Sequence, residues 1–492
     1  MNVSLLIIVP LLTAVSLLFC RGLKQVRAVS LAGASVQLLL SVYLLAAYWQ
    51  LRSAGDLSPM LFEFDQIWFQ PLGIHYHVGV DGISISMILL TAFVVFAGVL
   101  VSWTIEKLNK EYFFLLLFLS AGAYGFFISL DLFTLFFFLE IAVIPKFLLI
   151  GIWGSGKKEY SAMKLALMLM GGSALVFVGL AGLYFNTGTF NIMEIAAMNI
   201  PIEVQLVFFP FAFIGFGIFT ALFPFHTWVP DGHSSAPTAA SMFLAGISMK
   251  LGGYGCLRVA TFLMPDAAQS YSWIIIILAT IAIIYGAFAT MMQKDLKYIN
   301  AYSSVSHCGF VLLGIGMLTQ TAINGAVLQM VSHGLMTALF FAAIGMIYSR
   351  THTREVAKLG GLLKVTPFIS SVFVIAGLCS LGLPGLSGFV AEITIFMGSW
   401  QNPDALYRLA TILACASIVV TAVYILRAIG KTVMGPMSSA YSGLKDASWN
   451  EKLAAAVLII GIVLIGFAPF LINELIAPGT GIIMNKVAGN IK

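Results

Sequence analysis

The stretch DLFTLFFFLEIAVIPKFLLIGIWG, residues 131–154, decides how this chain folds. After its first residue, the stretch has only two ionisable side chains, Glu140 and Lys146. Its length matches the roughly 20 apolar residues that a helix needs to cross a lipid bilayer. A charge at mid-membrane costs roughly 3 kcal/mol on insertion scales, so such residues persist where they face one another or a wet cavity. The stretch therefore predicts a transmembrane helix with a functional acid near its middle.

The composition extends this interpretation to the whole chain. Its 492 residues are 60% hydrophobic and only 9% charged, whereas soluble domains are about 25% charged. This leaves no room for a separate soluble catalytic domain, and the net charge of +5 indicates topology rather than nucleic-acid binding. The five cysteines form no C-x-x-C motif, so we expect core residues rather than metal or cluster ligands. Arg21, Lys24 and Arg27 follow the first apolar run without a cleavage site, so we expect that helix to be retained.

Runs of spanning length recur along the chain and predict an all-α polytopic membrane protein of about 14 transmembrane helices. The seventh run ends in Pro224 and Pro230, and the twelfth carries Pro384, Gly385 and Gly388 near its middle. Helices interrupted by glycine or proline in corresponding positions of two halves indicate a transport site. We therefore expect helices seven and twelve to be broken. The expected helix cores are 2–20, 28–49, 83–103, 112–130, 132–153, 162–186, 205–223, 237–263, 273–292, 299–318, 322–348, 366–400, 407–434 and 453–474.

Charges in the loops between these runs predict the orientation of the chain. Lysines and arginines gather in alternate loops, which by the positive-inside rule face the cytoplasm. An even number of helices then places both termini in the periplasm. The basic loop residues are Arg21, Lys24, Arg27, Lys107, Lys110, Lys157, Lys158, Lys294, Lys297, Arg350, Arg354, Lys358, Lys364, Lys431, Lys445 and Lys452. The opposite loops carry Asp56, Glu63, Asp65, Asp81, Glu194, Glu203 and Asp266.

The loop at 50–82 is the longest on the periplasmic side. Its segment Phe62–Val80 alternates apolar and polar residues, which is typical of a short external hairpin. A plain covering loop is the alternative.

Further ionisable residues lie deep in other apolar runs. Lys250 is too far from either membrane surface to reach water along its own stem, whereas Lys164 has that alternative. Glu392 lies just beyond the break in the twelfth run and is the last deep acid. For Glu140, the alternative to a functional role is a hydrogen bond that specifies helix packing.

Four histidines complete the set of candidate residues. His307 and His333 lie on consecutive runs among serines and threonines, which favours a proton relay over two isolated hydrogen-bonded core residues. His226 and His233 flank the break after the seventh run, near the expected cytoplasmic face. They either admit protons there or cap the broken helix.

Six segments of the chain carry a family resemblance: FPFHTWVPDGHSSAPTAAS, KLGGYGCLR, AYSSVSHCGFVLLGI, QMVSHGL, RTHTRE and LPGLSGFVAE. They closely resemble the antiporter-like membrane subunits of the proton-pumping NADH:quinone oxidoreductase, respiratory complex I. The resemblance covers essentially the whole chain. Within that superfamily, VDGIS at 80–84 and RTHTRE at 350–355 favour the subunit M branch.

The resemblance implies two inverted five-helix repeats. Residues 1–110 would hold helices one to three with the external hairpin loop, and 111–265 would form the first repeat, helices four to eight. Residues 266–435 would form the second repeat, helices nine to thirteen, and 436–492 would hold helix fourteen and a C-terminal tail. Glu140, Lys250, His307, His333 and Glu392 match the family's row of buried ionisable residues.

The resemblance also implies a function and partners. The chain would translocate protons across a bacterial inner membrane, driven by NADH oxidation and quinone reduction in other subunits, with no redox cofactor of its own. Its partners would be the antiporter-like subunits L and N on either side, together with phospholipid and protons, and no nucleic acid. The alternatives are a D-type component of a multisubunit Na⁺/H⁺ antiporter, a membrane subunit of a membrane-bound hydrogenase, and a purely structural spacer. The cost of five buried charges argues against the spacer.

One position departs from the family pattern. The family usually has a lysine in helix seven, seven residues before the histidine of PFHTW, and here that residue is Phe219. Lys146 follows Glu140 by six residues, a rise of about 9 Å along a helix. We expect Lys146 to be the relocated partner of Glu140. Should Lys146 extend to cytoplasmic water instead, Lys164 would have to take that role.

Overall fold

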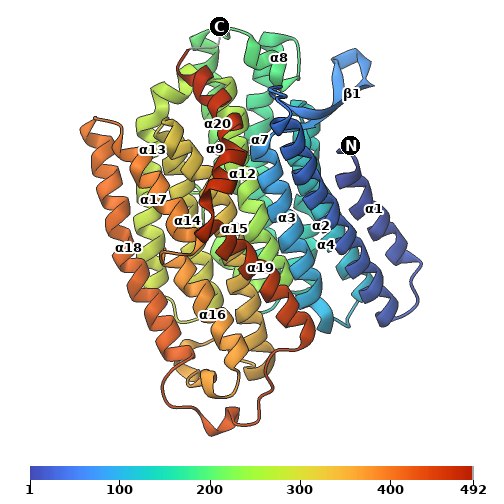
Figure 1. Cartoon of the computed structure of the whole chain (residues 1–492), viewed down its shortest axis with the longest axis vertical. Coiled ribbons are helices and arrows are strands. Elements are labelled where there is room, and N and C mark those ends of the chain that lie inside the picture. Colours follow the sequence, from blue (N-terminus) through green and yellow to red (C-terminus); the bar gives the residue numbers. More distant parts are fainter. Residues whose placement is uncertain (490–492) are drawn as a thin grey trace.

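The computed structural model describes residues 1–489 and shows a bundle of long helices that lie roughly along one axis (Figure 1). Within these residues, ten helices are long and apolar enough to cross a membrane. The chain is therefore a largely helical polytopic membrane protein, as its sequence predicts.

The first part of the chain holds four helices and a β-hairpin. Strands β1 (Leu61–Phe69) and β2 (Ile74–Val80) pair antiparallel, so this loop contains the hairpin rather than an irregular cover. The backbone N–H of His75 in β2 donates to the Asp131 carboxylate at 3.2 Å. Asp131 also caps the helix α5, which begins at Leu132. Burial raises the pKa of this carboxyl above its ordinary value. The four helices are α1 (Leu5–Leu18), α2 (Leu23–Ser53), α3 (Gly82–Val101) and α4 (Asn109–Ile128).

The second part contains two interruptions that matter for the site. The expected helix at 132–153 is divided at Ala142, because Pro145 has no N–H to bond Ile141 four residues earlier and its ring crowds that carbonyl. The chain between α9 and α10 is also non-helical. The helices are α5 (Leu132–Ile141), α6 (Val143–Trp153), α7 (Lys158–Thr187), α8 (Ile192–Ala197), α9 (Ile202–Phe219), α10 (Trp228–Ser235), α11 (Thr238–Phe243) and α12 (Met249–Gly255).

The last part repeats the pattern of long helices with one interruption. The chain between α16 and α17 is non-helical around Gly382 and Gly385, which have positive φ angles of 77° and 92° that favour glycine. The helices are α13 (Pro265–Met291), α14 (Leu296–Gly316), α15 (Gln320–Thr351), α16 (Pro367–Ser380), α17 (Ser387–Trp400), α18 (Ala405–Thr432), α19 (Trp449–Phe467) and α20 (Pro469–Val487).

The structure corrects three expectations about the ends of elements and about loop charges. The expected helix at 453–474 is divided at Ala468, and most of the expected tail is helical as α20, because Pro469 ends one helix and suits the first turn of the next. Asp81 is not a loop charge, since it is 1% exposed, caps α3 and pairs with the buried Arg258. Lys297 is likewise buried, at 4% exposure, near the start of α14.

The core brings helices from both halves of the chain together. Helix α15 is almost entirely buried and packs against α14, α16, α17 and α19. In the other half, α12 lies against the end of α9, where a Cβ on Gly252 would be only 2.4 Å from the carbonyl oxygen of Phe216. This close approach places α12 between α9 and the second half of the molecule, within the central layer of Figure 1.

Candidate functional site: a buried row of ionisable side chains

Lys250 lies in a stretch of helix with altered hydrogen bonding. Helix α12 is flanked by π-helical segments at Leu244–Ser248 and Cys256–Thr261, a conformation that is frequent at functional sites. The side chain is 1% exposed, and its Nζ donates to the carbonyl of Ala245, five residues back, at 2.7 Å. Its second partner is Nδ1 of His333, also at 2.7 Å. Lys250 is therefore fully buried yet bonded, and one of its bonds is to a titratable ring.

His333 and His307 form the next step of the row. His333 lies on α15 and His307 on α14, and their ring centroids are 5.3 Å apart. Nε2 of His333 is buried and has no hydrogen-bond partner among the described residues. A water that bridges two polar groups is nearly as good as a direct hydrogen bond, so a proton can pass between the two rings where a water lies between them.

His307 is the most richly bonded member of the row. Its Nε2 lies 3.0 Å from the hydroxyl of Ser380, at the end of α16. Its Nδ1 lies 3.2 Å from Nε2 of Gln329 and 3.5 Å from Oε1 of Glu392. This nitrogen thus faces a hydrogen-bond donor and a carboxylate at once. An imidazole in that setting can hold its proton in either of two arrangements, which is what a relay requires.

Glu392 ends the row on α17, the helix that follows the non-helical segment after α16. The side chain is 5% exposed. A Cβ on Gly382 would lie 2.6 Å from Oε2 of Glu392, so the glycine in the interruption is what admits the carboxylate. Four residues that the sequence predicts as functional, Lys250, His333, His307 and Glu392, thus lie consecutively across four helices. We call these four residues the central row.

Glu140 and Lys146 lie on either side of the bend between α5 and α6. Oε1 of Glu140 is buried without a hydrogen-bond partner among the described residues, and the residue as a whole is partly exposed. Lys146 is 1% exposed, so it does not extend to solvent at the surface of the molecule. Its Nζ likewise has no hydrogen-bond partner among the described residues and lies 5.8 Å from the centroid of the Phe219 ring. The ammonium group therefore occupies the space beside the helix-seven position.

Lys164 is placed differently from the other lysines. Its Nζ binds the Asp231 carboxylate at 2.7 Å, and the side chains of this pair are 23% and 26% exposed. Tyr298 donates to the other oxygen of Asp231 at 3.3 Å. The structure thus does not bring Lys164 to Glu140. Asp231 is missing from the sequence-based candidates because the motif VPDGH is typical of a turn.

The two histidines beside the break between α9 and α10 are buried. His226 stacks on Phe223, with ring centroids 5.5 Å apart, and is 3% exposed. His233 is 0% exposed, and neither of its ring nitrogens has a hydrogen-bond partner among the described residues. Its ring therefore caps no helix end, which removes one of the two alternatives for this residue.

Three further buried polar side chains are not among the candidates that the sequence predicts. Gln329 and Ser380 both contact His307, and the buried Lys297 donates to the carbonyl of Ala236 at 2.6 Å. A signal for Gln329 was available, because it precedes His333 by four residues and so shares its helix face. Ser380 offered no such signal, since its contact with His307 depends on how α14 and α16 pack.

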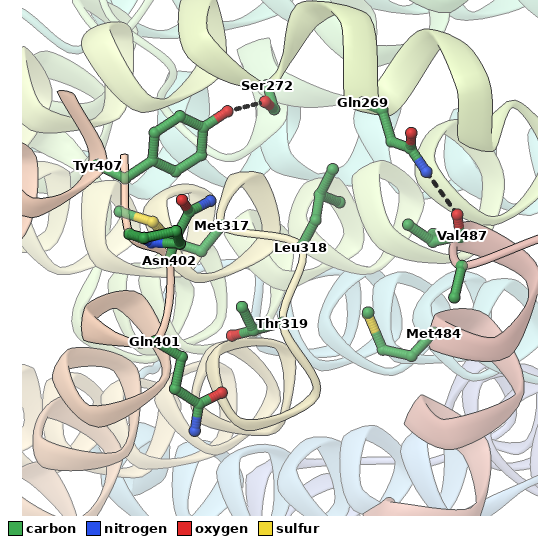
Figure 2. A pocket seen from close by; sticks show the side chains of 12 residues that line it. Gln269, Ser272, Met317, Leu318, Thr319, Gln401, Asn402, Tyr407, Met484 and Val487 are labelled. Carbon is green, nitrogen blue, oxygen red and sulfur yellow. Dashed lines mark hydrogen bonds between the residues drawn. The ribbon is translucent and has the colours of Figure 1, made fainter. Parts of the chain in front are cut away.

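A separate cavity of about 480 Å³ lies at the C-terminal end of the molecule (Figure 2). Several of its polar lining residues already have partners: Ser272 bonds Tyr407, and Gln269 donates to the carbonyl of Val487 at 2.5 Å. It is lined by no Asp, Glu, Lys, Arg or His and by no member of the central row. Between residues 1 and 489, no three His, Cys, Asp or Glu side chains come together in a way that could hold a metal ion.

The fold and the central row define a class of protein: a polytopic helical membrane protein with a line of ionisable groups through its interior. A family model described as "NADH:quinone oxidoreductase/Mrp antiporter, TM" matches residues 129–420. The chain is 36% identical over 480 residues to the NAD(P)H-quinone oxidoreductase chain 4 1 of Synechococcus sp. (strain JA-2-3B'a(2-13)), covering 96% of this chain and 90% of that one. It is 35% identical over 477 residues to the NADH-quinone oxidoreductase subunit M of Rickettsia typhi (strain ATCC VR-144 / Wilmington), covering 95% of each.

A solved structure agrees with these relatives. The chain superposes on one from the respiratory complex I of Thermus thermophilus with bound NADH, with a TM-score of 0.90, 26% identity and 99% of each chain covered. The protein therefore belongs to the NADH:quinone oxidoreductase/Mrp antiporter family. Within that family it groups with the subunit M and chain 4 relatives.

Proposed function

We propose that this chain is a proton-translocating membrane subunit of an NADH:quinone oxidoreductase, and that protons move along its central row. The observation that carries the proposal is the succession of neighbouring ionisable side chains from Lys250 through His333 and His307 to Glu392. Its steps are 2.7 Å from amine to imidazole, 5.3 Å between ring centroids and 3.5 Å from imidazole to carboxylate. Chains of Glu, Lys and His buried in a membrane are the usual material of proton pathways.

The chemistry of the row is a sequence of proton exchanges. An ammonium at Lys250 gives a proton to Nδ1 of His333, which releases one from its free Nε2. His307 receives that proton, directly or through a water, and passes one from Nδ1 to Glu392. Moving one charge against a membrane potential costs about 2.3 kcal/mol per 100 mV, so an external driving force is required.

We propose that Glu140 and Lys146 couple the row to that driving force. A nearby carboxylate favours the charged form of an ammonium group. While Glu140 is ionised and close, Lys146 retains its proton. When Glu140 moves away or is neutralised, Lys146 is left charged and without a hydrogen-bond partner in an apolar site, which favours proton release. Neither Nζ of Lys146 nor Oε1 of Glu140 bonds any described residue, which supports a site that is poised rather than locked.

The proposal includes the finer organisation expected from the sequence. The chain would cross a bacterial inner membrane 14 times, with α9–α10 and α16–α17 as the two broken helices of inverted repeats. Both termini would be periplasmic, and antiporter-like subunits L and N with phospholipid would cover its sides. The hairpin, α8 and the C-terminal end of α20 share one end of the bundle, and the α18–α19 loop lies at the other (Figure 1). The family description also covers Mrp antiporters, but the relatives at 35–36% identity are quinone oxidoreductase subunits.

Replacing Glu140 by glutamine tests the coupling step. We expect the Glu140→Gln complex to assemble and to pump protons much more slowly, because the amide keeps the shape of the side chain but not its charge. NADH oxidation should fall as well if redox chemistry and pumping are tightly linked. Acidification of reconstituted vesicles on addition of NADH measures the effect. Glu159→Gln, at an exposed acid on α7, is the matched control, and wild-type pumping by Glu140→Gln would exclude this role.

The position of the C-terminus tests the proposed topology. A reporter enzyme that is active only in the periplasm, fused after the last residue, should be active in whole cells. The same reporter placed in the loop between α18 and α19 should be silent. The opposite pattern would contradict an even number of membrane crossings.

A further inference from the structure

A stripe of polar side chains runs along one face of α14 from its first turn to the central row. Lys297, Asn300, Ser304 and His307 are spaced by three, four and three residues, which places them on one side of a helix with 3.6 residues per turn. None is more than 4% exposed. A buried polar stripe in a membrane protein is costly unless its members bond one another, another helix or water.

The first member lies beneath a partly exposed ion pair. The N-cap Asp295 pairs with Nε of Arg354 at 3.1 Å, and these side chains are 29% and 19% exposed. Asp295 also accepts from the backbone N–H of Lys297 at 2.7 Å. The buried Nζ of Lys297 donates to the carbonyl of Ala236. The partly exposed Asp295 therefore lies only two residues before a buried lysine in the sequence.

The middle of the stripe is matched by polar atoms on α15. Nδ2 of Asn300 donates to the carbonyl of Thr337 at 3.4 Å, and the hydroxyls of Ser304 and Thr337 lie 3.3 Å apart. Oδ1 of Asn300 is buried and has no hydrogen-bond partner among the described residues. A buried acceptor of this kind, beside two hydroxyls, provides the several polar partners that an internal water needs.

The inner end of the stripe reaches His307. The hydroxyl of Ser380 lies 3.0 Å from Nε2 of His307 and 3.4 Å from the hydroxyl of Ser303, next to Ser304. The row contacts His307 at Nδ1, through Glu392. The two nitrogens of this ring thus face two different polar routes.

We propose that this stripe is a second proton branch, which reloads His307 from the loop-side end of α14. The inference rests on the proposed function of the central row. A proton from solvent at Asp295 passes to the neutral amine of Lys297. It then crosses the hydroxyls of Ser304 and Thr337 and, through water, those of Ser303 and Ser380, where each oxygen accepts one proton and releases another and so ends unchanged. His307 gains the proton at Nε2 and gives one from Nδ1 to Glu392. The charge on Lys250, which His333 separates from His307, controls that transfer electrostatically.

The competing explanation is structural. Lys297 could serve only to hold the end of α10 through Ala236, and Ser304 donates to the carbonyl of Asn300 in its own helix at 2.9 Å, as serines in helices commonly do. The two explanations differ in what happens when a hydroxyl is removed without a change of shape.

The test uses Thr337→Val and Thr337→Ser in the whole complex, reconstituted into vesicles. Valine has the shape of threonine without its hydroxyl, whereas serine keeps the hydroxyl. With the branch, Thr337→Val should assemble normally but lower the protons pumped per NADH severalfold, and Thr337→Ser should pump as wild type does. Lys297→Gln, which can still donate to Ala236, should behave like Thr337→Val, whereas Lys294→Gln, at an exposed lysine nearby, should be silent.

Two other results would exclude the proton branch. Equal proton counts for Thr337→Val, Lys297→Gln and wild type would exclude the branch. A loss of assembly in Thr337→Val that Thr337→Ser restores, with a normal proton count in the complex that does form, would leave only the structural role. The Glu392→Gln variant, measured in parallel, distinguishes failure of the proton branch from failure of the proposed function. Normal pumping by Glu392→Gln would exclude the central row as the proton route.

Discussion

The Glu392→Gln variant is expected to pump protons at least about tenfold more slowly than the wild type, which corresponds to a barrier higher by roughly 1.4 kcal/mol. Glu392 is the last acid of the central row and the acceptor for Nδ1 of His307 at 3.5 Å. Both proposed routes into His307 leave through this carboxylate. Glutamine fills the same space under Gly382 but cannot take up a proton at neutral pH.

The measurement for Glu392→Gln is the initial rate of vesicle acidification together with the rate of NADH oxidation. Because the substitution conserves shape, the amount of assembled complex should be close to that of the wild type. Glu474→Gln, at an exposed acid on α20, controls for the loss of a carboxylate as such. Undiminished acidification by Glu392→Gln would mean that protons do not leave through α17.

The second large effect is expected at Lys146. The residue is 1% exposed, and its ammonium has no hydrogen-bond partner among the described residues and lies 5.8 Å from the centroid of the Phe219 ring. A desolvated cation over an aromatic face gains about 2 kcal/mol, which offsets only part of the cost of burial. Lys146→Met removes the charge and keeps the length of the side chain. We expect it to lower proton pumping about tenfold, as much as Glu140→Gln, since the proposed coupling needs both charges.

A double variant distinguishes relocation of a charge from simple damage. Lys146→Met combined with Phe219→Lys returns a positive charge to the helix-seven position and should recover part of the pumping. Phe219→Lys alone would place two cations side by side and should lose activity. This double-mutant cycle should show a large favourable coupling between the two sites. Additive losses would mean that Lys146 does not replace a charge at position 219.

The sequence was most informative about the central row. Lys250, His333, His307 and Glu392 could be chosen because a charge deep in an apolar run has few explanations. The order in which they meet, α12 to α15 to α14 to α17, depends on tertiary packing and could not be predicted from the residues alone. The same holds for Ser380, which reaches His307 only because α16 ends beside α14.

Residues near the ends of apolar runs were the least predictable. The sequence places Lys297 and Asp81 in loops because helix boundaries can be predicted only to within a few residues. A boundary that lies one turn away from the expected position is enough to bury such a side chain. Lys164 is a candidate because of its depth in an apolar run. Its partner Asp231 is not, because it lies in a motif that is typical of a turn. The bend at Ala142 could have been predicted from Pro145, which lies too far inside the run to be tolerated without a kink.

The proton count per NADH in sodium-free vesicles, for the wild type and the Lys250→Met variant, tests the central claim most directly. Lys250 begins the row, and in the proposed mechanism its charge drives the proton at His307 toward Glu392. The account predicts that the wild type acidifies the vesicles without sodium and that Lys250→Met gives a lower count of protons per NADH. An unchanged count in Lys250→Met, or a wild type that needs sodium, would contradict it.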